Sequence, residues 1–336
     1  MKYFIILILF ITILFAEDTI TNQEQSYQLG NGMQVGELPL YVGGYFSLDY
    51  RYKDGENRYR IDDIAFLAYG GYEKISYMAE LEYKEFYTLS EKDDAYTTQK
   101  DTRLHTERLY GDYNFNENYM LRLGKFNSQI GFWNLLPINV LRDTSSNPYT
   151  TDIIFPRFTT GLYAAYNSYN NAEIQIDLTI QHNEDLDPSY NNYTMDEHHS
   201  LGTTYTQENI SLKASIGMFD KYTSTNTTQV LYYALVSLKY ETEKFQFMSE
   251  LGSQKSTQEY TTPYAFFAQG VYHLNQEHAG IIRLESYEDK VQNTQDNIAI
   301  FGYTYRPLYP IAFKTEYQFH KLQNENQFLF SWSVLF

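Results

Sequence analysis

Apolar and polar residues alternate one by one over long segments, and this pattern recurs through almost the whole chain. Segment 173–182, for example, places isoleucine or leucine at every second position between polar residues. Segments 210–218 and 311–320 repeat the pattern. Successive side chains of a β-strand point to opposite faces, so each segment is predicted to be a strand with one apolar and one polar face. A strand that crosses a bilayer needs roughly 9–11 residues, whereas ordinary strands average about five or six. The segment length therefore favours membrane-spanning strands.

Applied to the whole chain, this pattern predicts about sixteen strands, an even number of the kind found in membrane barrels. The expected strands cover 41–52, 59–71, 75–88, 102–114, 119–127, 159–168, 172–182, 197–207, 209–219, 229–240, 245–254, 262–273, 278–288, 296–306, 310–320 and 326–336.

The connections between these strands alternate in length. Every second one is short, as at 72–74 and 169–171. Short turns at one end and longer loops at the other are typical of outer-membrane barrels, whereas a soluble propeller or sandwich has no reason for this parity. The sequence therefore predicts an all-β fold, a transmembrane antiparallel β-barrel spanning 41–336. The longer connections are 53–58, 89–101, 128–158, 183–196, 220–228, 255–261, 289–295 and 321–325.

The composition agrees with a barrel and excludes some partners. The chain has 35 tyrosines and 2 tryptophans, and a barrel uses such amphipathic rings at the two water–lipid boundaries. Cysteine is absent from the sequence, so the backbone ladder and packing must hold an exported chain together. A net charge of −17 disfavours nucleic acid as a partner, and no motif indicates a cofactor.

The first residues have the features of a targeting segment. Lys2 is followed by an apolar run that ends at Ala16, before Glu17 and Asp18. The run is short for a spanning helix of roughly 20 residues, so residues 1–16 are predicted to be a signal peptide, with an uncleaved anchor as the alternative. Residues 17–40 lack alternation through most of their length and are expected to form a periplasmic lead-in or a small plug.

The last strand, 326–336, carries Phe328, Phe330, Trp332, Val334 and Phe336 on one face. It resembles the terminal strand of bacterial outer-membrane proteins, whose final aromatic residue is recognised by the barrel assembly machinery. The resemblance implies that Phe336 is an assembly signal. It also implies a location in the outer membrane of a Gram-negative bacterium, in contact with lipid and lipopolysaccharide.

A second resemblance covers about a dozen residues, 121–133. Gly124-Lys125-Phe126 and Gly131-Phe132 are similar to a strand end and loop start in the phosphate-selective porin O/P-like family, within the general porins. This resemblance implies a porin that assembles as a homotrimer. The run of arginines and lysines that lines those phosphate channels is not visible here, so phosphate is not implied.

The connection 128–158 is too long to be an ordinary structureless loop. It carries apolar residues such as Trp133, Ile138 and Phe155, so we expect it to fold inward onto the barrel wall. The alternative is packing over the barrel mouth or against a neighbouring subunit. The resemblance to general porins implies that it is the constriction loop. The loop charges expected to face the narrowest point are Arg142, Asp143, Asp152 and Arg157.

Alternation also predicts which wall charges face the lumen. The two signs nearly balance, which predicts a transverse field acting on small polar solutes rather than a ring of one charge that selects ions strongly. The expected pore-lining residues are Arg51, Arg60, Asp62, Glu80, Glu82, Arg108, Asp112, Arg122, Arg283, Glu285, Lys314 and Glu316, with Lys84, Lys213 and Glu250 among further candidates.

Metal and catalytic motifs are not found. The acidic segments 91–94 and 183–187 lack EF-hand spacing, so solvated loop charge is favoured over a calcium site. The sequence contains no HExxH, cysteine cluster, phosphate-binding glycine loop or GxSxG. We therefore expect no metal site and no enzymatic activity.

Three functions are compatible with such a barrel. The favoured one is a porin for passive diffusion of small polar solutes or ions. A substrate-specific outer-membrane channel is a narrower version of it. The third is a non-conducting adhesion or structural barrel, whose lumen is blocked and whose loops 89–101, 128–158 and 183–196 bind a partner.

Overall fold

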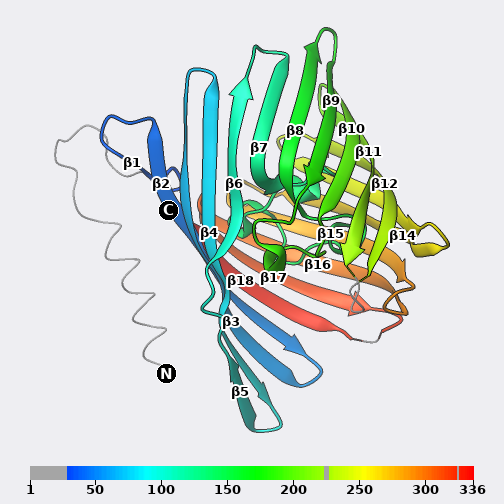
Figure 1. Cartoon of the computed structure of the whole chain (residues 1–336). Coiled ribbons are helices and arrows are strands. Elements are labelled where there is room, and N and C mark those ends of the chain that lie inside the picture. Colours follow the sequence, from blue (N-terminus) through cyan, green and yellow to red (C-terminus); the bar gives the residue numbers. More distant parts are fainter. Residues whose placement is uncertain (1–28, 223–226, 324) are drawn as a thin grey trace.

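The chain forms a closed antiparallel barrel of sixteen strands (Figure 1). The computed structural model describes residues 29–222, 227–323 and 325–336, so the predicted signal peptide lies outside the described residues. The barrel strands are β2 (Leu40–Lys53), β3 (Glu56–Tyr72), β4 (Ile75–Lys92), β6 (His105–Asn114), β7 (Tyr119–Asn127), β8 (Phe158–Tyr169), β9 (Glu173–His182), β10 (Glu197–Gln207), β11 (Ile210–Tyr222), β12 (Thr228–Glu241), β13 (Phe245–Ser256), β14 (Tyr260–His273), β15 (His278–Asp289), β16 (Thr294–Leu308), β17 (Ile311–His320) and β18 (Gln327–Leu335).

The two-residue period of the sequence decides which side chains face outward. On β9, Ile174, Ile176, Leu178 and Ile180 are each between 40% and 48% exposed on the outer surface. Asp177 and Thr179, on the opposite face, are buried inside the barrel. An apolar outer face and a polar inner face are what a barrel in lipid requires. The predicted fold class is confirmed.

The two ends of the chain close the sheet. Consecutive barrel strands pair in order, and β18 pairs with β2. The backbone N–H of Phe336 donates to the carbonyl of Gly44, and the N–H of Gly44 donates to the carbonyl of Phe336, each at 2.8 Å. Beyond this point the short strand β1 (Met33–Gln34) pairs with residues 41 and 42 of β2. The described part of the lead-in therefore forms a hairpin with the first barrel strand.

Some connections expected to be long are tight turns. The strands on either side of 53–58 continue to a two-residue turn at Asp54 and Gly55, which have φ of 51° and 78°. An Asp-Gly pair favours such a hairpin turn. The segment 89–101 is likewise largely a hairpin, in which β4 extends to Lys92 and pairs with β5 (Ala95–Gln99). This hairpin protrudes from one end of the barrel (Figure 1).

The connection after β7 folds into the barrel, as predicted. It contains the 3₁₀ turns η1 (Trp133–Leu135) and η2 (Asn139–Leu141) and the short helix α2 (Tyr149–Ile153). Trp133 packs with Met248 and Phe267 on the wall, and Val140 packs in a cluster with wall residues of β2, β3 and β17. Burial of these apolar side chains stabilises the inward conformation. Within the described residues, no helix is long and apolar enough to cross a membrane.

A second loop, 183–196, also folds inward, which the sequence analysis did not predict. It contains the 3₁₀ turn η3 (Pro188–Tyr190). Its Asp185 forms an ion pair of 2.5 Å with Lys125 of β7, and both side chains are almost completely buried. Met195 is fully buried in the same cluster as Ile154 and Phe155 of the first loop. The barrel interior is therefore narrowed by two loops.

Candidate functional site in the barrel interior

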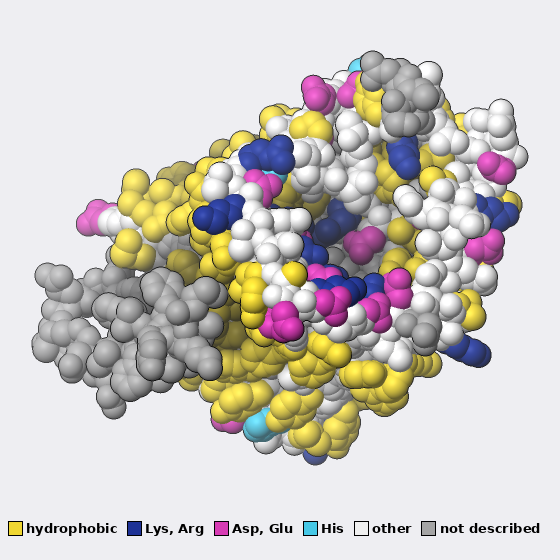
Figure 2. Space-filling view, turned by 90° about the horizontal axis from the view of Figure 1, so that it is seen from below, with side chains coloured by type: hydrophobic (Ala, Val, Ile, Leu, Met, Phe, Trp, Pro, Cys, Tyr) yellow, Lys and Arg dark blue, Asp and Glu magenta, His cyan; other side chains and the backbone are white. Residues whose placement is uncertain are grey.

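Charged side chains gather inside the barrel. Figure 2 looks into it from the end where the β4–β5 hairpin protrudes, and basic and acidic groups lie in the central hollow. Apolar side chains cover much of the outer surface in the same view. The interior is therefore where the chain can interact with polar solutes.

Three wall carboxylates hold the backbone of the first inward loop. Glu250 of β13 accepts hydrogen bonds from the N–H groups of Phe132, at 2.6 Å, and Trp133, at 3.1 Å. Glu285 of β15 accepts one from the N–H of Tyr149 at 3.0 Å. Glu316 of β17 accepts hydrogen bonds from the N–H groups of Ser145 and Ser146 and from the hydroxyl of Ser146. Hydrogen bonds to charged acceptors are among the strongest in proteins, so these carboxylates fix the loop at three points.

Three wall cations hold carbonyl groups of the same loop. Arg283, fully buried, donates to the carbonyl of Ser146 at 2.9 Å and pairs with Glu285 at 2.8 Å. Lys314 donates to the backbone and side-chain oxygens of Asn139. Arg306 donates to the carbonyls of residues 140 and 142. Among the predicted pore-lining residues, Arg283, Glu285, Lys314 and Glu316 thus face the interior but contact the loop rather than open water.

The four loop charges lie in different environments. The guanidinium of Arg142 is buried and donates to the carbonyls of Leu136 and Pro137, so it braces its own loop. Asp143 lies 3.6 Å from Arg306. Burial raises the pKa of Asp152, and the nearby Arg157 opposes this shift. Arg157 itself borders a cavity.

Wall charges on β2, β3 and β4 form a compact ion network. Arg60 pairs with Asp49 at 3.0 Å, with Asp62 at 3.4 Å and with Glu85 at 2.6 Å. Arg51 faces Arg58 across the strand pair, and its side chain is partly buried. The structure thus brings the predicted residues Arg60 and Asp62 into contact and places Arg51 beside them.

A β-bulge places one more carboxylate inside the barrel than alternation predicts. Glu80 pairs with Arg108, and the next β4 residue is opposite Thr106, so Glu107 is the extra residue of the bulge. Bulges re-aim side chains in this way. Glu107 and Glu82 share the hydroxyl groups of two tyrosines, Tyr45 and Tyr190. No sequence signal marks this bulge, so Glu107 was missed.

Nearer the short-turn end, Asp112 and Arg122 form a bidentate pair at 2.7 and 2.8 Å. The Arg122 guanidinium lies 4.0 Å from the centre of the Tyr110 ring. Such a stacked bidentate geometry is specific to arginine.

The second loop buries acidic residues that were expected to be solvated. Besides the Lys125–Asp185 pair, Asp187 lies 2.9 Å from Nδ1 of His105 and accepts the N–H of Thr106. Burial raises the pKa of Asp187, but hydrogen bonds from Ser189, His105 and Thr106 outweigh it, and the pKa lies below its ordinary value of 3.8. In the described part of the chain, no group of three potential metal ligands comes together.

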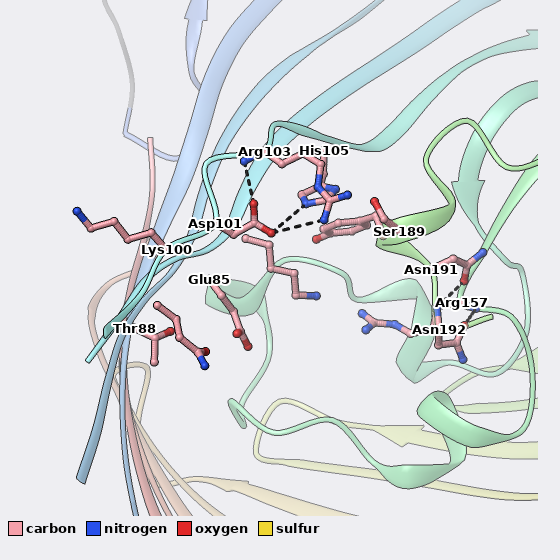
Figure 3. A pocket seen from close by; sticks show the side chains of 13 residues that line it. Glu85, Thr88, Lys100, Asp101, Arg103, His105, Arg157, Ser189, Asn191 and Asn192 are labelled. Atoms are coloured by element: carbon pink, nitrogen blue, oxygen red, sulfur yellow. Dashed lines mark hydrogen bonds and ion pairs between the residues drawn. The ribbon is translucent and has the colours of Figure 1, made fainter. Parts of the chain in front are cut away.

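Open space remains on both sides of the first loop. A cavity of about 200 Å³ lies between the loop and β6–β7, bordered by Arg108, Arg122 and Leu135. One of about 380 Å³ lies between the loop and the opposite wall, bordered by Trp133, Lys239 and Arg306. A third, of about 440 Å³, lies at the mouth near the second loop (Figure 3).

The fold is similar to that of bacterial outer-membrane porins of known structure. Among similar solved structures, OmpF of Salmonella typhi has a TM-score of 0.60 and 10% identity, and the match covers 93% of this chain and 100% of OmpF. The outer membrane channel DcaP of Acinetobacter baumannii has a TM-score of 0.57 and 10% identity, with 88% and 97% covered. OprB of Pseudomonas putida has a TM-score of 0.57 and 8% identity, with 89% and 93% covered.

Sequence comparisons give no family. No protein-family model matches the chain, and no curated protein matches it. The likeness therefore defines the fold, and the narrower resemblance to the phosphate-selective O/P-like family stays a prediction.

Proposed function

We propose that this chain is an outer-membrane porin, a water-filled channel for passive diffusion of small polar solutes or ions. The observation that carries the proposal is a closed barrel, apolar outside and charged inside, narrowed by an inward loop that leaves cavities of about 200 and 380 Å³ on its two sides. Closure removes the sheet edges that lipid does not tolerate. A polar lumen of this kind supports permeation by hydrated solutes.

The location and partners follow from this function. The barrel would lie in the outer membrane of a Gram-negative bacterium, with lipid and lipopolysaccharide around it and Phe336 read by the assembly machinery. OmpT of Vibrio cholerae, an outer-membrane protein of similar structure, has been solved in a trimer form, and this supports a homotrimer here. We expect no catalytic activity.

Selectivity is expected to be weak in most of the lumen. Most of the charges that we assign to the pore lining are already paired with each other, as Arg60 is with Asp49 and Arg122 is with Asp112. Others hold the first loop, which we propose to be the constriction loop. A paired charge attracts a passing ion less than a free one, so size would govern passage there more than charge.

Liposome swelling with a panel of neutral sugars of increasing size tests the proposal. A porin gives rates that fall smoothly with solute size. A substrate-specific channel gives a high rate for one solute class only. The observation in favour of such a channel is the second inward loop, which narrows the lumen further. A non-conducting surface barrel gives no swelling with any solute, although the protein is folded, and that result would refute the proposed function.

A further inference from the structure

A cavity of about 440 Å³ at the long-loop mouth has the size of a small-molecule site. It lies between β4, the segment that joins β5 to β6, the second inward loop and Arg157 at the end of the first one. Figure 3 shows Arg157 reaching toward this space from the side opposite Glu85, with Arg103 and His105 along a third side. Tyr190 contributes a ring to the lining.

The two carboxylates that border the cavity are already paired. Glu85 lies 2.6 Å from Arg60 and 3.3 Å from Arg58, both outside the cavity lining. Asp101 lies 3.7 Å from Arg103 and 3.9 Å from His105. Their negative charge is therefore compensated before any solute enters.

Three cations in the cavity lining, Lys84, Lys100 and Arg157, have no such partner in the described part of the chain, and the Lys100 side chain points away from the cavity (Figure 3). Among residues 29–222, 227–323 and 325–336, neither Lys84 nor Arg157 forms an ion pair within 4.0 Å. The Lys84 ammonium lies 4.7 Å from the centre of the Tyr190 ring. The Arg157 guanidinium lies 5.7 Å from the Phe158 ring, and its Nε is buried without a hydrogen-bond partner.

The terminal nitrogens of Arg157 form no hydrogen bond among the described residues, and a solute with an acceptor oxygen would give them a partner. The planar fork of a guanidinium matches the two oxygens of a carboxylate or phosphate, and a nearby ammonium adds a second positive charge. The neighbouring Asn191 and Asn192 side-chain amides already donate to other oxygens, so the two cations define the site.

We propose that this cavity binds a small oxyanion, a solute that bears a carboxylate or a phosphate group, between Arg157 and Lys84. The inference rests on the proposed porin function and names the solute class that this mouth would admit first. The distant, solvent-exposed part of the chain's net charge of −17 is screened beyond about 8 Å at physiological salt.

Calorimetric titration of the purified protein in detergent tests the site without requiring conductance. The probes are succinate, inorganic phosphate and succinamide, the neutral analogue of succinate. We expect at least one of the two anions to bind and succinamide to fail. The anion that binds tells whether a carboxylate or a phosphate is preferred. Binding of neither anion, or equal binding of succinamide, would overturn the proposal.

Two variants and a matched control locate the site. Arg157→Gln and Lys84→Gln should each weaken anion binding roughly ten-fold, since each removes a charged contact. Lys100→Gln removes the same charge from the same cavity lining, but this side chain points away from the cavity (Figure 3), so its affinity should stay within about two-fold. An equal loss of anion affinity in all three variants would show that the positive charge at the mouth attracts anions in general and that no specific site exists.

Reversal potentials in a KCl gradient separate this inference from the proposed function. The wild-type channel should favour chloride, and Arg157→Gln should shift the potential toward potassium. A protein that conducts but binds no anion would overturn the site and leave the porin function intact. A protein that binds the anion but never conducts would overturn the function and leave the site intact.

Discussion

Buried charges inside this barrel act first as structural contacts. Arg283 is fully buried and joins the first inward loop to Glu285 on the wall. Glu250 accepts two backbone N–H groups from the start of that loop. Removal of one partner leaves another polar group buried and unpaired, which costs more than the contact itself contributes. Residues that a sequence would assign to solute contact therefore determine whether the loop stays in place.

Arg283→Met tests this role. It should lower the free energy of unfolding by about 3–5 kcal/mol, because Glu285 and the loop carbonyl lose a buried charged partner. Urea unfolding in detergent micelles or lipid vesicles, followed by tyrosine and tryptophan fluorescence, measures the change. Arg103→Met is the matched control: its side chain is 61% exposed, and we expect a change within about 0.5 kcal/mol. Similar stability of both variants would contradict the structural role of Arg283.

The Lys125–Asp185 pair should be coupled strongly. In a double-mutant cycle with Lys125→Met and Asp185→Asn, we expect the double variant to be more stable than additivity predicts by about 1–3 kcal/mol. The partly exposed pair Lys53–Glu325, with side chains 30% and 46% accessible, is the control and should couple by less than about 1 kcal/mol. Equal coupling energies would mean that burial of the inner pair does not matter.

Asp187 should make the stability of the second loop fall in acid. Because its folded pKa lies below 3.8, its contribution to stability is present above the unfolded pKa and is lost as pH falls through the folded value. Hydrogen-exchange protection of the backbone amides in 183–196 should be high at pH 7 and pH 5 and should fall below about pH 3.8. In Asp187→Asn this acid step should be smaller. A step of equal size in the variant would assign it to other groups.

At the scale of elements, strands were predictable and inward loops only partly so. The bounds of β7 and β10 match the sequence prediction because alternation is strict and polar turns flank it. β5 was missed since its residues, Ala95–Gln99, are all exposed and carry no apolar face. Glu107 was missed because a bulge breaks the parity. Asp185 was assigned to solvent because its partner, Lys125, lies in a distant strand that only the folded barrel brings near.

The last strand makes a prediction about assembly. The two hydrogen bonds between Phe336 and Gly44 use backbone atoms only, so Phe336→Ala keeps them. We expect unchanged refolding of the purified variant in detergent but a several-fold lower amount in the outer membrane of cells, where the aromatic ring would be recognised. Quantitative blotting of membrane fractions measures this. Equal amounts of variant and wild type would refute the assembly role of Phe336.

The first inward loop should set the size of the pore. Replacing 135–152 with a short glycine-serine linker removes η2 and all but the last residue of α2, and the single-channel conductance should rise about two-fold or more. Circular dichroism is the folding control, since the strand content should not change. A folded variant with unchanged conductance would show that the narrowest point lies elsewhere, with the second loop as the next candidate.

For the molecule as a whole, the closed barrel with an apolar outer face and a charged inner face explains the composition, the strand order and the inward loops. The barrel turns apolar side chains such as Ile176 and Leu178 outward and charged ones such as Asp177 inward. The closure of β18 on β2 completes the cylinder. Two loops then narrow the interior without filling it, since cavities remain between the wall and the first loop.

Single-channel recording of the purified protein in a planar bilayer tests this account most directly. We predict discrete, ohmic current steps of uniform size after insertion, because a fixed water-filled lumen conducts in proportion to voltage. Correctly folded, inserted protein that gives no steps at any voltage would contradict the account.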